Sequence, residues 1–247
     1  MFYRRRLFSL LSSLIITIAA SLSVETFASA GDRADKDGNK ARVEAPLNMA
    51  ILIQDDLIST VGGEIRVTAD FIRSLPNGSR VMVAYITAGT LQVRQPFTPD
   101  LDRAARSLRI PVASTSGSPF NPYVEVIEAL RHFDASWKGR NALLLISDGL
   151  DVSRGFDSSA AGHTIDLERA IREANSRRVP VYSFYAPSVG LTSHSLLAVN
   201  YGQSSLNRIS DDTGGRAFFQ GTTGFVTFNS YFDRLRAALN AQYAQAY

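Results

Sequence analysis

A polar turn that follows an apolar run is the first place where this chain could do chemistry. The run 142–146 reads Ala-Leu-Leu-Leu-Ile, and Ser147, Asp148, Gly149 and Leu150 follow it. Five consecutive apolar residues are typical of a strand buried on both faces of a parallel sheet. Open α/β sheets bind ligands outside the carboxyl ends of their strands. The pattern therefore predicts that the carboxylate of Asp148 lies on a ligand-binding rim.

Alternating strand and helix patterns predict the sheet that would position this turn. Strands are predicted over 49–53, 80–87, 90–97, 142–146, 179–186 and 216–219. Helices are predicted over 61–75, 100–108, 122–133, 164–178, 206–212 and 225–239. The tight turn at Ala88 and Gly89 should make its two flanking strands an antiparallel hairpin. We therefore expect an α/β fold with a doubly wound, mostly parallel six-stranded sheet, one antiparallel edge strand and helices on both faces.

The first thirty residues have the pattern of a secretory signal peptide. Arg4, Arg5 and Arg6 precede an apolar stretch over 7–24, and an Ala-Ser-Ala sequence offers a cleavage site after Ala30. An uncleaved membrane anchor is the alternative, but serines and threonines interrupt the stretch and make it a poor permanent span. Residues 31–46 are polar and charged, which predicts a disordered linker before a single domain over 47–247. We expect an exported protein of the periplasm or the cell exterior, without membrane attachment after cleavage.

The composition argues against several classes of function. The chain has no cysteine, so an exported fold of this size does not depend on disulfides. Its formal charge is +3, and loss of three arginines and one glutamate with the signal leaves +1. The mature part has no basic cluster with interleaved aromatics, which argues against nucleic acid. No glycine-rich phosphate loop follows the first strand, which argues against a nucleotide.

Five segments of the chain, taken together, point to a known family. They are 50–56 (AILIQDD), 75–81 (LPNGSRV), 145–149 (LISDG), 212–218 (DTGGRAF) and 239–243 (LNAQY). In their order and spacing, the chain from about residue 47 onward resembles a von Willebrand factor type A (VWA) domain, of the variety found in exported bacterial proteins. The resemblance implies the doubly wound sheet deduced above. It also implies a role in adhesion or assembly, although a fold does not fix a function.

The resemblance further implies one divalent cation at the carboxyl rim. The ion is commonly Mg²⁺, with Mn²⁺ or Ca²⁺ as alternatives, and such hard cations take oxygen ligands. The family draws these oxygens from an Asp-x-Ser-x-Ser run after the first strand, a Ser or Thr before the third helix and the Asp that ends the fourth strand. Asp148 matches the last of these sources. Ser116 or Ser118 could supply the second.

The first of these three sources departs from the family pattern. With the strand ends aligned, Gln54 stands at the Asp position, and Asp56 and Ile58 stand at the two Ser positions. A shift of one residue restores Asp55 and Ser59 but turns the side chains to the other side of the segment. Two readings stay open: a cation site, or a lapsed site whose acids cap the next helix and accept backbone hydrogen bonds. The candidate metal ligands are Asp55, Asp56, Ser59, Ser118 and Asp148, with the carbonyl oxygen of Gln54.

The rim suggests two classes of function. The first is an exported, non-enzymatic protein-binding domain; with a cation bound, an acidic side chain of the partner would ligate it, and without a cation the same rim would bind directly. The second is a metal-assisted enzyme, for which His163 and His194 are the candidate bases or zinc ligands beside Asp148. A structural scaffold without a ligand is a third possibility. The predicted partner-binding residues are Gln54, Asp56, Ser116, Ser118, Asp148 and Asp151.

Overall fold

A computed structural model describes residues 43–117, 121–137, 139–153, 155, 163–219 and 227–246 of this chain. The predicted signal peptide and residues 31–42 of the predicted linker lie outside the described residues, and so do Ser118 and the predicted helix start at Phe225. Residues 43–46 are described, and the side chain of Val43 is buried against the domain. Among the described residues, no helix combines the length and the apolar character that a membrane crossing needs.

Six strands form one sheet, in the order β3-β2-β1-β4-β5-β6. The strands are β1 (Leu47–Gln54), β2 (Arg80–Thr87), β3 (Thr90–Thr98), β4 (Arg140–Ser147), β5 (Val181–Tyr185) and β6 (Ala217–Phe218). Neighbouring strands are parallel except for β3, which pairs antiparallel with β2 at one edge. The mostly parallel six-stranded sheet with one antiparallel edge strand is therefore confirmed.

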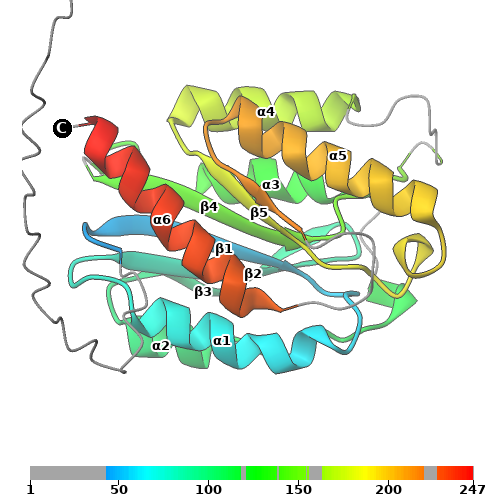
Figure 1. Cartoon of the computed structure of the whole chain (residues 1–247), viewed down its shortest axis with the longest axis horizontal. Coiled ribbons are helices and arrows are strands. Elements are labelled where there is room, and N and C mark those ends of the chain that lie inside the picture. Colours follow the sequence, from blue (N-terminus) through cyan, green and yellow to red (C-terminus); the bar gives the residue numbers. More distant parts are fainter. Residues whose placement is uncertain are drawn as a thin grey trace, which may run out of the picture. The chain divides into compact units, whose positions relative to one another are not determined.

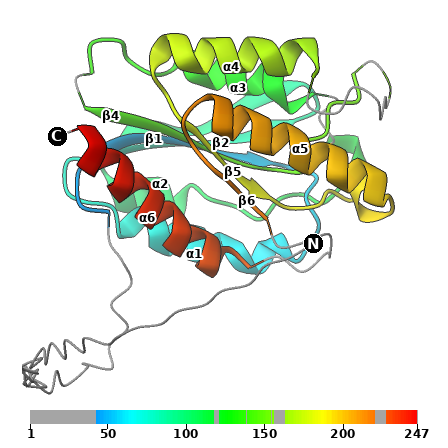
Figure 2. The same ribbon diagram turned by 45° about the horizontal axis from the view of Figure 1, so that its top comes forward.

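Helices cover both faces of this sheet (Figures 1 and 2). The helices are α1 (Val61–Arg73), α2 (Leu101–Arg106), α3 (Pro122–Arg131), α4 (Ile165–Arg177), α5 (Leu196–Asp212) and α6 (Phe228–Ala246), with short 3₁₀ turns η1 (Thr115–Gly117) and η3 (Leu191–Ser193). Helices α1, α2 and α6 pack on one face, and α3, α4 and α5 pack on the other. All eight residues of β1 are buried, as expected for a central strand between two helical layers.

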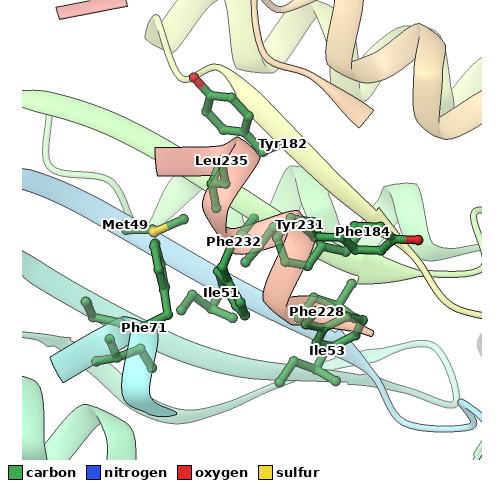
Figure 3. Packing of buried hydrophobic residues seen from close by; sticks show 14 of the residues in the cluster. Met49, Ile51, Ile53, Phe71, Tyr182, Phe184, Phe228, Tyr231, Phe232 and Leu235 are labelled. Atoms are coloured by element: carbon green, nitrogen blue, oxygen red, sulfur yellow. The ribbon is translucent and has the colours of Figure 1, made fainter. Parts of the chain in front are cut away.

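The face under α6 is rich in aromatic side chains (Figure 3). The ring of Phe184 on β5 lies 4.9 Å from Phe232, 5.2 Å from Tyr231 and 5.4 Å from Phe228, between ring centroids. Phe232 also stacks on Phe71 of α1 at 4.4 Å. Aromatic contacts of this kind stabilise beyond the area that they bury. The last helix of the chain therefore completes the core that the first helix begins.

Side-chain caps fix where several helices begin. Asn121 accepts a hydrogen bond from the backbone N–H of Tyr123 at 3.0 Å, and Pro122 takes the first helical position of α3, as the sequence predicted. Thr164 caps α4 and Ser195 caps α5 in the same way. All three caps stand at the end of the sheet where β1, β4 and β5 finish. They define the positions of the segments that form the rim.

Helix α5 is longer than the sequence predicted, because it begins at Leu196 rather than at residue 206. The prediction failed since this segment contains Gly202 and several polar residues that favour helices weakly. In the structure its buried side uses small residues, Ala198, Gly202 and Ser205. A Cβ at position 202 would stand 1.9 Å from the backbone oxygen of Asp148. Packing against the turn after β4, rather than intrinsic propensity, decides the conformation here.

Candidate functional site

The rim gathers polar side chains because β1 and β4 are neighbours whose ends lie level. Ile53 pairs with Ile146, so Gln54 and the Ser147-Asp148 turn emerge side by side. The side-chain oxygen of Gln54 accepts a hydrogen bond from Ser147 Oγ at 2.5 Å and one from the backbone N–H of Asp148 at 3.3 Å. We call Gln54, Asp56, Ser147, Asp148, Ser188 and Thr192 the rim cluster. All six side chains are buried.

Backbone donors fix which way the Gln54 amide points. The N–H of Gly149 donates to Ser147 Oγ at 2.9 Å, and the Ser147 hydroxyl donates its own proton to the Gln54 side-chain oxygen. The N–H of Asp148 also requires an acceptor, which is the same Gln54 oxygen. The amide nitrogen of Gln54 is thereby turned to the other side. It donates to Asp56 Oδ1 at 2.7 Å.

Asp148 accepts one hydrogen bond from its own turn and one from the segment that follows β5. Its carboxylate accepts from the backbone N–H of Leu150 at 3.1 Å and from Thr192 Oγ1 at 3.3 Å. Thr192 in turn lies 3.0 Å from Ser188 Oγ, in the segment that follows β5. Burial raises the pKa of Asp148 to about 6, and the negative charge of Asp56 adds to this rise. The cluster therefore holds two acids that disfavour each other's ionisation.

Asp55 takes no part in this cluster, although it follows Gln54 directly. Arg109 binds its two carboxylate oxygens at 2.6 and 2.8 Å, and the N–H of Val112 donates to it at 3.0 Å. The Arg109 guanidinium also lies 4.1 Å from the ring centroid of Tyr85. Burial raises the pKa of Asp55, but the hydrogen bonds and charge of Arg109 outweigh it and leave that pKa below its ordinary value. This ion pair holds the segment after α2 against the rim.

The other predicted rim residues are placed separately. Ser59 and Ser116 are exposed, and the N–H of Ser116 donates to Ser114 Oγ. The Asp151 carboxylate accepts from the N–H and the hydroxyl of Ser153 at 3.1 and 2.7 Å. Ser118 lies outside the described residues. Among the described side chains, the structure thus joins Gln54, Asp56 and Asp148 and leaves Asp55, Ser59, Ser116 and Asp151 outside the rim cluster.

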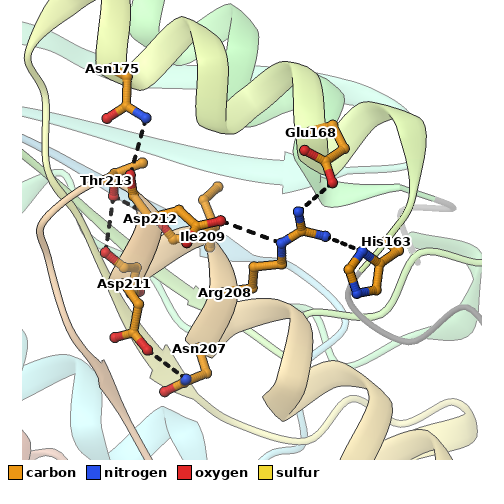
Figure 4. Close-up of polar contacts among 10 residues, drawn as sticks. His163, Glu168, Asn175, Asn207, Arg208, Ile209, Asp211, Asp212 and Thr213 are labelled. Atoms are coloured by element: carbon orange, nitrogen blue, oxygen red, sulfur yellow. Dashed lines mark hydrogen bonds and ion pairs between the residues drawn. The ribbon is translucent and has the colours of Figure 1, made fainter.

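Neither candidate histidine is among the described partners of Asp148. The ring nitrogen Nδ1 of His163 lies 2.5 Å from Arg208 on α5, which also pairs with Glu168 at 2.5 Å and with Asp212 at 3.3 Å (Figure 4). His194 is exposed just before the cap of α5. The enzymatic hypothesis required a base held beside Asp148. The described contacts supply none.

The described donor set does not fit a divalent cation. Within the described ranges, no group of three or more acidic or histidine side chains could hold a metal ion. Asp56 and Asp148 offer carboxylate oxygens, but the N–H of Gln54 is directed at Asp56, and an N–H donor cannot be a ligand. Mg²⁺ demands a near-octahedral shell of oxygens. The Gln54 amide therefore satisfies a carboxylate that a cation would otherwise neutralise.

Apolar side chains at the rim were not predicted from the sequence. The N–H of Val112 donates to Asp55, and Val124 follows Tyr123, whose hydroxyl donates to the Gly149 carbonyl at 2.8 Å. Leu191 precedes Thr192, and Leu196 and Leu197 begin α5. Ile165 begins α4 next to Asp166, which accepts a hydrogen bond from the α3 cap Asn121. In the part of the chain that the structure describes, the exposed large apolar side chains are Ile110, Val112, Val124, Ile165, Leu191, Leu196 and Leu197. All belong to segments at the carboxyl rim.

No protein-family model matches the sequence, and no curated protein matches it. Solved structures match its fold. An aerotolerance-related membrane protein from Bacteroides fragilis is 14% identical with a TM-score of 0.54, and the match covers 80% of this chain and 100% of that one. BatB from Bacteroides thetaiotaomicron is 14% identical with a TM-score of 0.52, over 82% of this chain and 100% of that one.

These two likenesses, together with the strand order, show that the chain has a VWA-like fold, as the resemblance implied. At 14% identity they show the fold alone. A structure described as the SpRpn10 VWA domain overlaps less closely, with a TM-score of 0.41 and 12% identity over 74% of this chain and 100% of that one.

Proposed function

We propose that this chain is an exported, non-enzymatic domain that binds a partner protein with its carboxyl rim and needs no cation to do so. Export rests on the signal-peptide pattern of residues 1–30. The protein-binding role rests on the rim itself. The expectation of an acidic partner side chain depended on a bound cation, and we replace it with an apolar contact.

The position of the exposed apolar side chains is the observation that carries this proposal. Leu196 is 65% exposed, Leu197 54% and Val112 62%. Large apolar side chains gathered at one edge, among polar groups, mark interaction sites on soluble proteins. Partner binding would remove these side chains from water, which contributes favourably in proportion to the apolar area buried.

The rim cluster gives this surface a rigid base. Gln54 ties β1 to the turn after β4, and Thr192 ties the start of the α5 segment to that same turn. The Asp55–Arg109 pair fixes the segment that carries Ile110 and Val112. The apolar side chains are therefore held before a partner arrives, which reduces the entropy that binding must overcome.

A capture experiment with matched variants tests the proposal. The purified mature protein is immobilised and exposed to exported proteins of its source organism, alongside a Leu196→Ser/Leu197→Ser variant. An Arg131→Ser/His132→Ser variant, changed at exposed positions on the far end of α3, is the control. We expect a specific partner whose affinity falls about tenfold or more in the rim variant and is unchanged in the control. Equal binding by all three proteins would refute a rim-centred function.

A further inference from the structure

A cavity lies at the opposite edge of the sheet from the rim, beside the amino ends of β4 and β5. Its volume is about 850 Å³. The ends of α3, α4 and α5 and the residues just before β5 form its walls. The side chains that matter for its chemistry are Phe133, Trp137, Arg140, Arg177, Arg178 and Thr213.

Positive charge dominates the lining, with three arginines and a single carboxylate, Asp134. Two of these arginines already have partners. Arg140 donates to the Leu239 carbonyl at 2.5 Å, and Arg177 pairs with Glu173 at 2.6 Å. The exposed side chain of Arg178 has no hydrogen-bond or ion-pair partner within the described ranges. One guanidinium at this cavity is therefore available to a ligand.

The backbone of Arg178 has an unfavourable conformation. It follows the last residue of α4 with φ 54° and ψ 45°, the left-handed region that glycine normally occupies at a helix end. A side chain there costs about 1–2 kcal/mol. A cation near a helix carboxyl end does favour the helix dipole, but Arg177, one position earlier, already serves that purpose. The dipole thus explains a basic residue nearby, but not an arginine in this strained position.

The remaining walls suit the organic body of a ligand. Trp137 supplies aromatic surface, and its buried indole N–H has no acceptor among the described residues. Phe133 is buried against Phe97, at 5.0 Å between ring centroids, and backs this wall. Figure 4 shows how the far wall is held: the Asn175 amide donates to the Asp212 carbonyl at 3.0 Å, and the Thr213 hydroxyl donates to the Ile209 carbonyl at 2.7 Å. The ends of α4 and α5 are thereby joined.

We infer that this cavity binds a small organic anion, whose phosphate or carboxylate group pairs with Arg178 while its body packs against Trp137. A guanidinium binds either group through two parallel hydrogen bonds, which makes arginine the fitting side chain for both. The inference is independent of the proposed rim function, because the two sites lie at opposite ends of the strands.

Ligand-dependent melting of the purified protein tests this inference. The probes are phenyl phosphate, benzoate and inorganic phosphate, each compared with sodium chloride at equal ionic strength. We expect phenyl phosphate or benzoate to raise the Tm by about 2–4 °C at about five times its Kd, and inorganic phosphate to do less. The better of the two aromatic probes identifies the acidic group. No rise above the chloride control with any probe would overturn the inference.

An Arg178→Gly variant separates binding from folding. Glycine adopts the left-handed conformation without strain, so the unliganded variant should melt at a higher temperature than the wild type. Its affinity for the aromatic probe should nevertheless fall at least about tenfold, because the free guanidinium is gone. Arg172→Ala, at an exposed position on α4 away from the cavity, is the control and should bind as the wild type does. Wild-type affinity in Arg178→Gly would overturn the assignment of the anion to Arg178.

Discussion

Gly202 of α5 packs directly on the backbone carbonyl of Asp148, at the point where the candidate site meets the helical layer. An ideal Cβ at position 202 would stand 1.9 Å from that oxygen. We therefore expect Gly202→Ala to destabilise the protein by about 2–3 kcal/mol, because the backbone of either α5 or the Asp148 turn must move to make room for the methyl group. Urea unfolding measures this loss.

Gly63 provides the matched control for this substitution. It lies within α1, and a Cβ there would meet no atom within 4 Å. Gly63→Ala should stabilise the protein by about 0.5–1 kcal/mol, since alanine favours a helix. Similar effects of the two alanines would show that α5 does not approach the Asp148 turn as closely as described.

Gln54 decides whether the rim responds to metal. Because its amide nitrogen already donates to Asp56, we expect Mg²⁺ or Mn²⁺ to leave the Tm of the wild type unchanged. Gln54→Asp replaces that donor by a third carboxylate. This variant should melt at a lower temperature without metal, and Mn²⁺ at about 100 times its Kd should restore about 2.7 kcal/mol.

Melting curves in EDTA, MgCl₂ and MnCl₂ measure both effects. Gln54→Asn keeps an amide at this position and serves as the uncharged control. Its Tm should not change when either metal is added. A metal-dependent rise in the wild type that Asp148→Ala abolishes would instead establish the cation site that the family resemblance implied.

The Asp55–Arg109 ion pair should contribute far more stability than the exposed pairs. Asp55 keeps only 5% of its side chain exposed, so Arg109→Gln leaves a buried carboxylate without its cation. We expect a loss of about 3–5 kcal/mol at pH 7, measured by urea unfolding. Arg73→Gln breaks an exposed pair with Asp102 and should cost less than about 1 kcal/mol. If the two variants lose equal stability, the Asp55 pair is no stronger than a surface contact.

Glu125 on α3 should make stability depend on pH. Burial raises the pKa of this carboxyl to about 7, and the nearby charge of Glu128 adds to the rise. Between the ordinary pKa and 7, the folded state binds more protons than the unfolded chain. The free energy of unfolding should therefore fall as the pH rises through this window.

Glu125→Gln removes the charge that causes this fall. Above pH 7 the variant should be more stable than the wild type by about 1–3 kcal/mol, and at pH 4 the two should be nearly equal. Urea unfolding at pH 4, 6 and 8 gives the comparison. Glu128→Gln, at an exposed position, is the control and should shift the curve only slightly. Parallel pH profiles for the wild type and Glu125→Gln would contradict the buried-acid interpretation.

Most of the sheet could be predicted because its strands carry strong local signals. The predicted second strand has the bounds of β2, Arg80–Thr87. The tight turn at Ala88 and Gly89 correctly predicted that the next strand, β3, pairs antiparallel with β2. Helix α5 was predicted too short since its first half depends on packing against the Asp148 turn. Such a contact between distant segments leaves no pattern in local sequence.

In the candidate site, too, some contacts could be predicted from the sequence and others could not. Gln54 and Asp148 could be expected side by side, because carboxyl ends of neighbouring parallel strands meet at one edge. Thr192 and Arg109 were missed: Arg109 lies 54 residues beyond Asp55, and its contact depends on how the chain returns after α2. The direction of the Gln54 amide also follows from backbone donors, which only three-dimensional structure supplies.

The aromatic contacts of α6 have a consequence for the timing of folding. Phe71 and Phe184 are covered by Phe232, and the N–H of Phe228 donates to Glu64 at 2.6 Å, so the last helix seals a layer begun by the first. A nascent chain that lacks α6 would expose one apolar face of its sheet to water. Completion of this domain must therefore wait until α6 has been synthesised.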